Sequence, residues 1–152
     1  MPTATTLQGA AMSAPPFPRT VCGCALDRAH CQRPAYLIPG DLERIAEDLG
    51  TTATSILYLF RPGKGAIVAD SRTGVTFRIP TIVPRTTDRG CVFLDSAGRC
   101  VIHHVAPFGC AYFDIHMPMA EADQRSVWGL GLVLRSVDYR DHLDALRSGG
   151  SS

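Results

Sequence analysis

The sequence lacks any long apolar run and any strong excess of charge. No stretch approaches the roughly 20 residues that a membrane-spanning helix needs. Residues 1–20 have no basic start, and Gln8, Gly9 and Ser13 interrupt their apolar stretch, so we predict no secretory signal. Lys and Arg number 15 against 14 Asp and Glu, which gives no sign of a nucleic-acid or membrane partner. We therefore predict a cytoplasmic protein.

Two common catalytic signatures are also missing. The glycines at 63, 65, 129 and 131 do not form the G-x-x-x-x-G-K-[ST] loop that binds phosphates. No Ser, His and Asp arrangement suggests nucleophilic catalysis, and sequence alone cannot reveal the lowered pKa of a reactive cysteine. The catalytic residues therefore remain unknown, and the sequence leaves open whether the protein is an enzyme.

What the sequence does have is six cysteines in two clusters that also contain histidine. Thiolates and imidazoles grouped in this way suit a soft or borderline metal ion. Two alternatives are small buried hydrophobes and disulfides, but grouping with histidine argues against the first and a reducing cytosol against the second. The predicted metal ligands are Cys22, Cys24, Cys31, Cys91, Cys100, Cys110, His30 and His103.

Two of the predicted ligands are histidines. His30 is either a ligand or a neighbour that orients Cys31. His103 and His104 point to opposite sides if the segment is extended, and we prefer His103 as the ligand. A mononuclear iron site of His103, Asp114 and His116 is a weaker alternative. His142 lies on a polar helix face and is expected to be solvated.

Apolar periodicity and turn residues predict a small α+β domain of short helices and β-hairpins organised around a Cys/His metal site. Leu42, Ile45, Ala46 and Leu49 form one helical stripe, which Asp41 is expected to cap. A short second helix is expected from Thr51 or Thr52 to about Phe60, and later helices are expected over 121–135 and 138–147. The glycines at 129 and 131 suggest a kink, close packing or a strand in place of the second half of the helix over 121–135. The expected strands are 66–69, 75–83, 91–95 and 99–102.

The expected domain organisation is simple. Residues 1–20 are predicted to be a disordered N-terminal segment, residues 21–147 the cysteine-cluster metal-binding domain, and residues 148–152 a flexible tail. The hairpin around residues 96–98 brings Cys91 and Cys100 near one another. Domains with strands this short often gain stability from a bound metal.

Several motifs resemble the YkgJ-like cysteine-cluster family, the CxxCxxCC proteins described as zinc- or iron-chelating. The motifs are Cys91-Val-Phe-Leu-Asp95, Gly98-Arg-Cys100-Val-Ile102 and Pro107-Phe-Gly-Cys110, with Cys31, Tyr36-Leu-Ile-Pro39, Asp41 and Arg44-Ile45 upstream. The resemblance covers about Cys22 to Phe113 and implies metal binding more firmly than any reaction. The chain departs from the family where Cys22 and Cys24 are one residue apart and where His30 stands in a cysteine position.

Two functions from different classes follow from these residues. In the first, four cysteines hold iron as an iron–sulfur cluster, which the uneven spacings favour. In the second, Cys and His hold zinc in a closed site that stabilises the fold of an interaction module. A non-haem iron enzyme or accessory modification protein is a third possibility. The metal ion is the only partner that the sequence indicates, and any protein partner is unknown.

Overall fold

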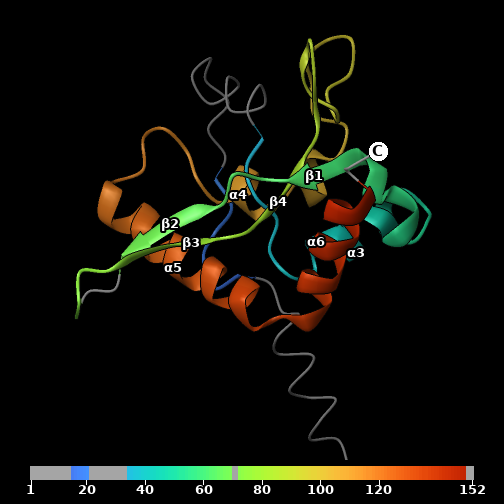
Figure 1. Cartoon of the computed structure of the whole chain (residues 1–152). Coiled ribbons are helices and arrows are strands. Elements are labelled where there is room, and N and C mark those ends of the chain that lie inside the picture. Colours follow the sequence, from blue (N-terminus) through green and yellow to red (C-terminus); the bar gives the residue numbers. More distant parts are fainter. Residues whose placement is uncertain (1–14, 21–33, 70–71, 150–152) are drawn as a thin grey trace, which may run out of the picture.

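The computed structural model describes residues 15–20, 34–69 and 72–149, and it is a small α+β domain (Figure 1). The first half contains α3 (Asp41–Asp48), η2 (Thr54–Leu59), β1 (Phe60–Pro62), β2 (Ala66–Ala69), β3 (Thr76–Ile79) and β4 (Ile82–Pro84). The second half contains β5 (Thr86–Thr87), β6 (Gly90–Cys91), η3 (His103–Val105), α4 (Phe108–Ala111), α5 (Met119–Arg135) and α6 (Val137–Gly149). The prediction of a small α+β domain is thus confirmed.

Helix α3 forms where the apolar stripe predicted it. Leu42, Ile45 and Ala46 are buried, and Gly50 with φ 76° lies just beyond the C-terminal end. The predicted cap is wrong, because the N-cap residue is Gly40 and no side chain bonds to the helix N-terminus from that position. The side chain of Asp41 is instead used in contacts with other segments.

The next predicted helix is a 3-10 helix, η2. The predicted cap at Thr51 or Thr52 is wrong, because the N-cap residue is Ala53 and no side chain caps the helix from that position. Thr52 Oγ1 does accept a hydrogen bond from the Ser55 amide at 3.4 Å. The tighter helix runs directly into β1 at Phe60, whose ring is fully buried. A short 3-10 segment is a common connection of this kind.

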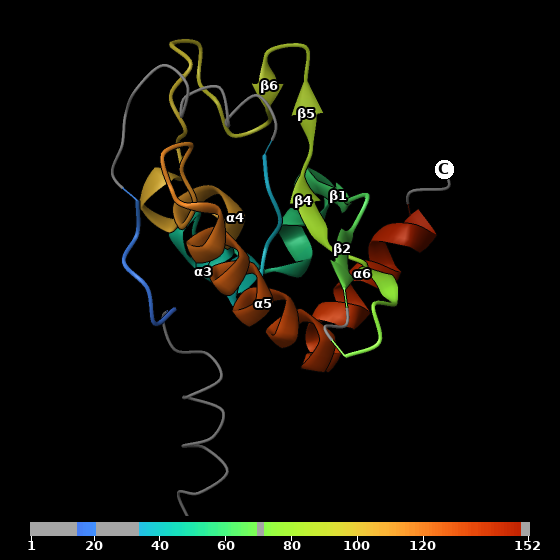
Figure 2. The ribbon, with the colours of Figure 1, turned by 90° about the vertical axis from the view of Figure 1, so that its left-hand side faces the viewer.

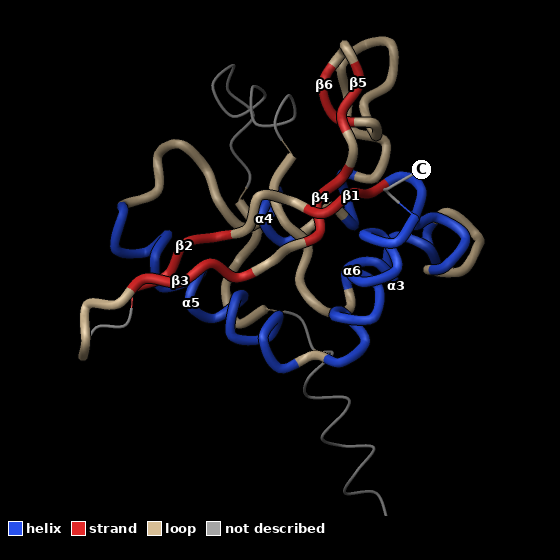
Figure 3. The backbone as a smooth tube through the Cα atoms, viewed as in Figure 1, coloured by secondary structure: helices blue, strands red, loops and turns tan. Residues whose placement is uncertain are grey.

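The central strands make two two-stranded antiparallel sheets, β1–β4 and β2–β3, which follow one another along the same two chain segments (Figure 3). Strand β2 pairs with β3 through Ala66↔Ile79, and β1 pairs with β4 through Phe60↔Pro84. The register changes by one residue between the two pairs. Gly63 lies between β1 and β2, and an added Cβ there would lie 2.8 Å from Thr81 Oγ1. A side chain at position 63 would therefore push the two strands apart.

Burial along the predicted strand 75–83 differs from the expectation. Val75 is 61% exposed and Phe77 is 45% exposed, whereas Ile79 is buried. On the paired strand β2, Ala66 and Val68 pack partly against the core, whereas β3 is buried only at Ile79. Alternation correctly indicated a strand, but it did not reveal how far the core extends along it.

The two C-terminal helices confirm part of the prediction. Helix α5 is helical throughout, and the close-packing alternative holds for Gly129, where an added Cβ would lie 2.7 Å from Phe108 Cε2. Leu143 and Leu146 of α6 are buried as expected. Helix α6 continues through Gly149, beyond the predicted end at residue 147. The cap predicted at Asp138 is replaced by Ser136, whose Oγ accepts the hydrogen bond from the Tyr139 amide.

An aromatic cluster fills the space between α4 and α5. The fully buried ring of Phe108 lies 5.2 Å from Tyr112, 5.4 Å from Phe113 and 5.5 Å from Trp128, measured between ring centroids. The sequence showed only scattered aromatic residues. The fold gathers them around α4, the short helix that contains Cys110.

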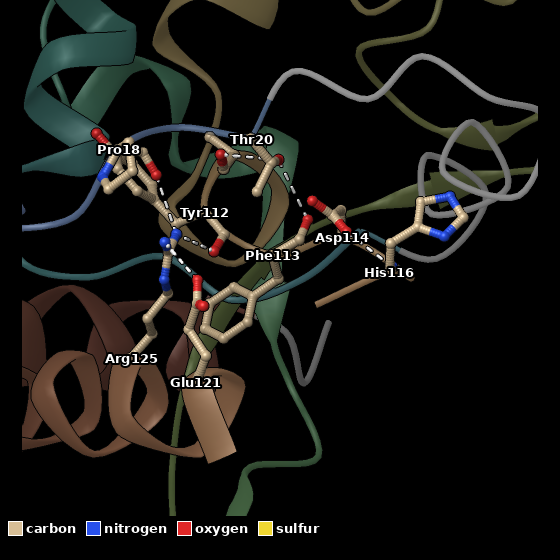
Figure 4. Close-up of polar contacts among 9 residues, drawn as sticks. Pro18, Thr20, Tyr112, Phe113, Asp114, His116, Glu121 and Arg125 are labelled. Carbon is tan, nitrogen blue, oxygen red and sulfur yellow. Dashed lines mark hydrogen bonds and ion pairs between the residues drawn. The ribbon is translucent and has the colours of Figure 1, made fainter. Parts of the chain in front are cut away.

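The described part of the N-terminal segment, residues 15–20, runs beside α4 (Figure 2). The rings of Phe17 and Trp128 make an edge contact with centroids 5.6 Å apart. Residues 15–20 thus make ring contacts and hydrogen bonds with the domain (Figure 4). Within the described residues, no helix has the length and apolar character needed to cross a membrane.

Candidate functional site

The second cysteine cluster lies on three successive local structures. Cys91 is the last residue of β6, Cys100 pairs with Leu94 in an isolated antiparallel bridge, and Cys110 lies in α4. The Val101 amide donates to Phe93 O at 2.8 Å, so the predicted return of the chain is confirmed. It is a turn closed by one bridge and not a pair of full strands. Cys91 is buried, and Cys100 and Cys110 are half-buried.

Asp95 holds the turn between Cys91 and Cys100. Its Oδ1 accepts hydrogen bonds from the Ala97 amide at 2.8 Å and the Arg99 amide at 2.9 Å, and Gly98 has φ 79°. The bond from the Arg99 amide, followed by that from Ala97, lowers the pKa of the Asp95 carboxyl. The turn is thus specified locally, as expected for Asp at the start of a turn and Gly near its end.

The sulfur of Cys110 has a backbone donor from a distant part of the chain. The Ala35 amide donates to Cys110 Sγ with a distance of 3.4 Å. The neighbouring Gly109 amide donates to Tyr36 O at 2.9 Å, and an added Cβ at Gly109 would lie 2.5 Å from Ala35 Cβ. Glycine is required for this close approach. An amide aimed at sulfur favours the thiolate, the form that binds metal.

Asp41 fixes the N-terminal end of α4, and sequence reasoning missed this role. Its carboxylate is fully buried, and Oδ2 accepts the Ile38 amide at 2.9 Å and the Phe108 amide at 2.8 Å. Oδ1 pairs with Arg44. Burial raises the pKa of Asp41, although Arg44 and the two amides oppose this rise. The carboxylate therefore joins α3 to the helix that contains Cys110.

The same short helix also binds the described residues on both sides of the first cysteine cluster. The Thr20 amide donates to Ala111 O at 2.9 Å, and Ala35 bonds to Cys110 as described above. Thr20 precedes Cys22 by two residues, and Ala35 follows Cys31 by four. Cys22, Cys24, His30 and Cys31 themselves lie outside the described residues.

The histidines of the second cluster lie in a 3-10 turn, so the expectation of an extended segment is wrong. His103 is exposed, and its role as a ligand stays a prediction. His104 Nε2 lies 2.6 Å from Asp48 Oδ1 of α3. The two neighbours thus differ in their surroundings, and His104 already has a carboxylate partner. His142, expected to be solvated, is half-buried.

Among the described residues, no three His, Cys, Asp or Glu side chains form a group that could hold a metal ion. The triad of His103, Asp114 and His116 is therefore not formed, although all three residues are described. Asp114 Oδ1 instead accepts the His116 amide at 2.7 Å, which makes a local turn. The same finding applies to Cys91, Cys100, Cys110 and His103, which are all described and form no such group by themselves. The predicted ligands of the first cluster lie outside the described part of the chain.

Comparison with protein-family models, curated proteins and solved structures found no match to this chain. The resemblance to the cysteine-cluster family therefore stays a prediction, which depends on the motifs quoted above.

Proposed function

We propose that this protein binds iron, preferably as an iron–sulfur cluster held by four cysteines, or else zinc. The ligands come from the set Cys22, Cys24, Cys31, Cys91, Cys100 and Cys110, with His30 and His103 as additional donors. The observation that carries the proposal is the attachment of both flanks of the first cluster to α4. It brings Thr20 and Ala35, which flank the first cluster in sequence, next to the helix that contains Cys110.

Few residues separate Thr20 and Ala35 from the cysteines of the first cluster. Cys22 follows Thr20 by two residues and Cys31 precedes Ala35 by four. Each residue extends the chain by at most about 3.6 Å. Thr20 and Ala35 bond to Ala111 and to Cys110. A site that uses thiols from both clusters is therefore compatible with the anchored chain.

The surroundings of the described cysteines fit a thiolate-bound metal. Cys91 is 7% exposed, so an ionised thiol there needs a positive partner to offset its lost hydration. Cys110 accepts an amide hydrogen bond, and such bonds to sulfur help to set the potential of iron–sulfur centres. When bound, an iron–sulfur cluster would supply one-electron redox chemistry, whereas zinc would supply none.

The zinc alternative is favoured by a different observation. From Cys91 to Cys110, the chain has only short turns and helices of three and four residues. A closed zinc site would tie these turns together, as it does in small domains with little regular structure. The function of the domain would then be to bind a protein partner.

The experiment that tests the proposal is the measurement of iron, zinc and acid-labile sulfide per chain, on protein purified without oxygen and without a metal-binding tag. Iron with matching sulfide supports the cluster, and zinc alone supports the structural site. Iron without sulfide would instead favour mononuclear iron. A chain that retains none of these metals and binds none when reconstituted would refute the proposal.

Cys110→Ser, with Ser96→Ala as its control, tests the ligand set. Ser96 is exposed in the turn of the same cluster, and its replacement should leave metal content unchanged. Cys110→Ser should lose most of the metal, because an alcohol is a poor substitute for a thiolate. Full metal retention in Cys110→Ser would show that Cys110 is not a ligand.

A further inference from the structure

The β2–β3 sheet leaves apolar side chains exposed on both of its faces. Ile67 pairs with Arg78, and Val68 pairs with Phe77. Because successive residues of a strand point to opposite faces, Ile67 and Phe77 lie on opposite faces of the sheet. Both side chains are exposed, and β3 is buried only at Ile79. The domain itself therefore covers little of this sheet.

The sheet also has an open edge. In the described part of the chain it consists of two strands, so β3 pairs with β2 alone. The other edge of β3 presents backbone N–H and C=O groups that can pair with a further strand. Two antiparallel strands by themselves are marginally stable, and a third strand on an apolar face stabilises them. The edge is consequently a suitable place for strand addition.

The charge around this edge is positive, although the chain as a whole is nearly neutral. Residues 60–84 have a net charge of +3, whereas the whole chain has +1. The charged residues of this range are Arg61, Lys64, Arg72 and Arg78, with Asp70 as the one acid. The charge of the segment therefore favours an acidic partner over a basic one.

The side chains of β3 specify the pattern of such a partner more closely. A strand added beside β3 would have one side chain next to Phe77 on one face and its neighbour next to Arg78 on the other. Arg78 Nη1 donates to Lys64 O at 2.8 Å and to Gly65 O at 3.4 Å. A guanidinium has five N–H donors, so it can bond to a carboxylate as well. The complement of β3 is thus a strand that alternates apolar and acidic residues.

A second copy of this chain does not supply that complement. Two β3 edges brought together would place two segments of charge +3 side by side, and like charges repel. The most acidic described segment is α3, which contains Asp41, Glu43, Glu47 and Asp48. A helix has its backbone groups paired internally and cannot add to a sheet edge. The occupant is therefore a different polypeptide.

We propose that the outer edge of β3 is a docking site for an extended segment of a partner protein in which acidic and apolar residues alternate. The segment adds to the β2–β3 sheet as a third strand, a known mode of peptide recognition. Its backbone bonds to the edge, its apolar side chains cover Phe77, and its carboxylates pair with Arg78. No predicted metal ligand lies in this sheet, so the inference is independent of the metal-binding proposal.

The test uses a fluorescently labelled peptide of alternating valine and glutamate with blocked ends, and binding to the full chain is followed by fluorescence anisotropy. A second peptide has lysine in place of glutamate. A third keeps the valine and glutamate side chains but has N-methyl groups on two consecutive central amides, which removes backbone donors from both edges of the peptide strand. We expect the first peptide to bind with a Kd of about 1 mM or tighter, and the other two to bind much more weakly.

Two pairs of variants test the role of the β3 side chains. Arg78→Glu is compared with Arg140→Glu, an equal charge change at an exposed position of α6, and Phe77→Ser is compared with Val127→Ser at an exposed position of α5. Arg78→Glu should weaken binding of the glutamate peptide about 5- to 30-fold and strengthen binding of the lysine peptide. Phe77→Ser should weaken binding about 5-fold, and the two controls should keep wild-type affinity.

Several results would overturn the proposal. Absence of binding to the glutamate peptide would do so, as would equal binding of the N-methylated peptide, since no strand would then be added. Equal binding of the lysine peptide would show that charge does not select the partner. Equal losses in the controls would place the peptide elsewhere on the protein. Dimerisation of the wild type in sedimentation velocity, abolished by Phe77→Ser, would assign the edge to a second copy instead.

Discussion

Replacement of Asp41 tests whether a buried carboxylate connects α3 to the helix that contains Cys110. In Asp41→Ala, the amides of Ile38 and Phe108 lose their acceptor. A buried amide without a partner costs about 1–3 kcal/mol, so the variant should lose roughly 2–6 kcal/mol of unfolding free energy. Since small domains are stable by about 5–15 kcal/mol, this is a large fraction of the total.

Asp41→Asn keeps the shape and one oxygen at the position of Oδ2. That oxygen can accept both amides, and the variant loses mainly the pairing with Arg44, whose side chain is 42% exposed and can turn to water. We expect a loss within about 1 kcal/mol. The control is Asp48→Ala in the same helix, because the partly exposed Asp48–His104 pair should also contribute less than about 1 kcal/mol.

The assay is urea unfolding followed by the fluorescence of Trp128, the one tryptophan of the chain, which packs against Phe108. A loss below about 1 kcal/mol in Asp41→Ala would contradict the role given to the two amides. An equal loss in Asp41→Asn and Asp41→Ala would show that the charge matters and the hydrogen bonds do not.

The pH dependence of the unfolding free energy of wild type and Asp41→Asn provides a second check. Burial raises the folded-state pKa of Asp41 above the unfolded value of about 3.9. The resulting contribution to stability is fully present below that value and is lost as the pH rises through the folded-state pKa. The stability of wild type relative to Asp41→Asn should therefore fall as the pH increases above about 4. A relative stability that rises with pH would refute the direction of the shift.

Two further pairs of variants should differ within each pair, the first in stability and the second in metal content. Gly129→Ala should lower the unfolding free energy by about 1–3 kcal/mol, because the added methyl group meets the buried Phe108 ring. Gly131→Ala should raise it by roughly 0.5–1 kcal/mol, because alanine favours the helix. Thermal unfolding of both variants tests this, and a stabilised Gly129→Ala would contradict the close packing. His103→Ala should lower metal content and His104→Ala should not, which metal analysis of the two proteins decides; the reverse result would exchange their roles.

Part of the fold follows directly from local sequence. The stripe of Leu42, Ile45 and Ala46 determined α3, because a helix places residues three and four apart on one face. Asp95 and Gly98 determined the turn in the second cluster, since Asp95 accepts amides within four residues and Gly98 adopts a positive φ. These elements depend on contacts between near neighbours, which a sequence displays.

Other features depended on contacts that the sequence does not display. Val75 and Phe77 alternate as a buried strand face does, yet both are exposed, because the core ends at Ile79. Gly129 could indicate a kink or close packing, and the ring of Phe108 decided for close packing. Periodicity gives the spacing of side chains but not the extent of the surface that covers them.

The candidate site divides in the same way. The sequence by itself determined which residues suit a metal, because thiols and imidazoles are recognisable by type and grouping. Only the tertiary structure assigned Asp41 to the Phe108 amide and Arg125 to the carbonyls of Pro18 and Tyr112. Asp41 and Phe108 are 67 positions apart, and Pro18 and Arg125 are 107 apart. A buried charge is stable only beside partners that satisfy it, and those partners become neighbours only when the chain has folded.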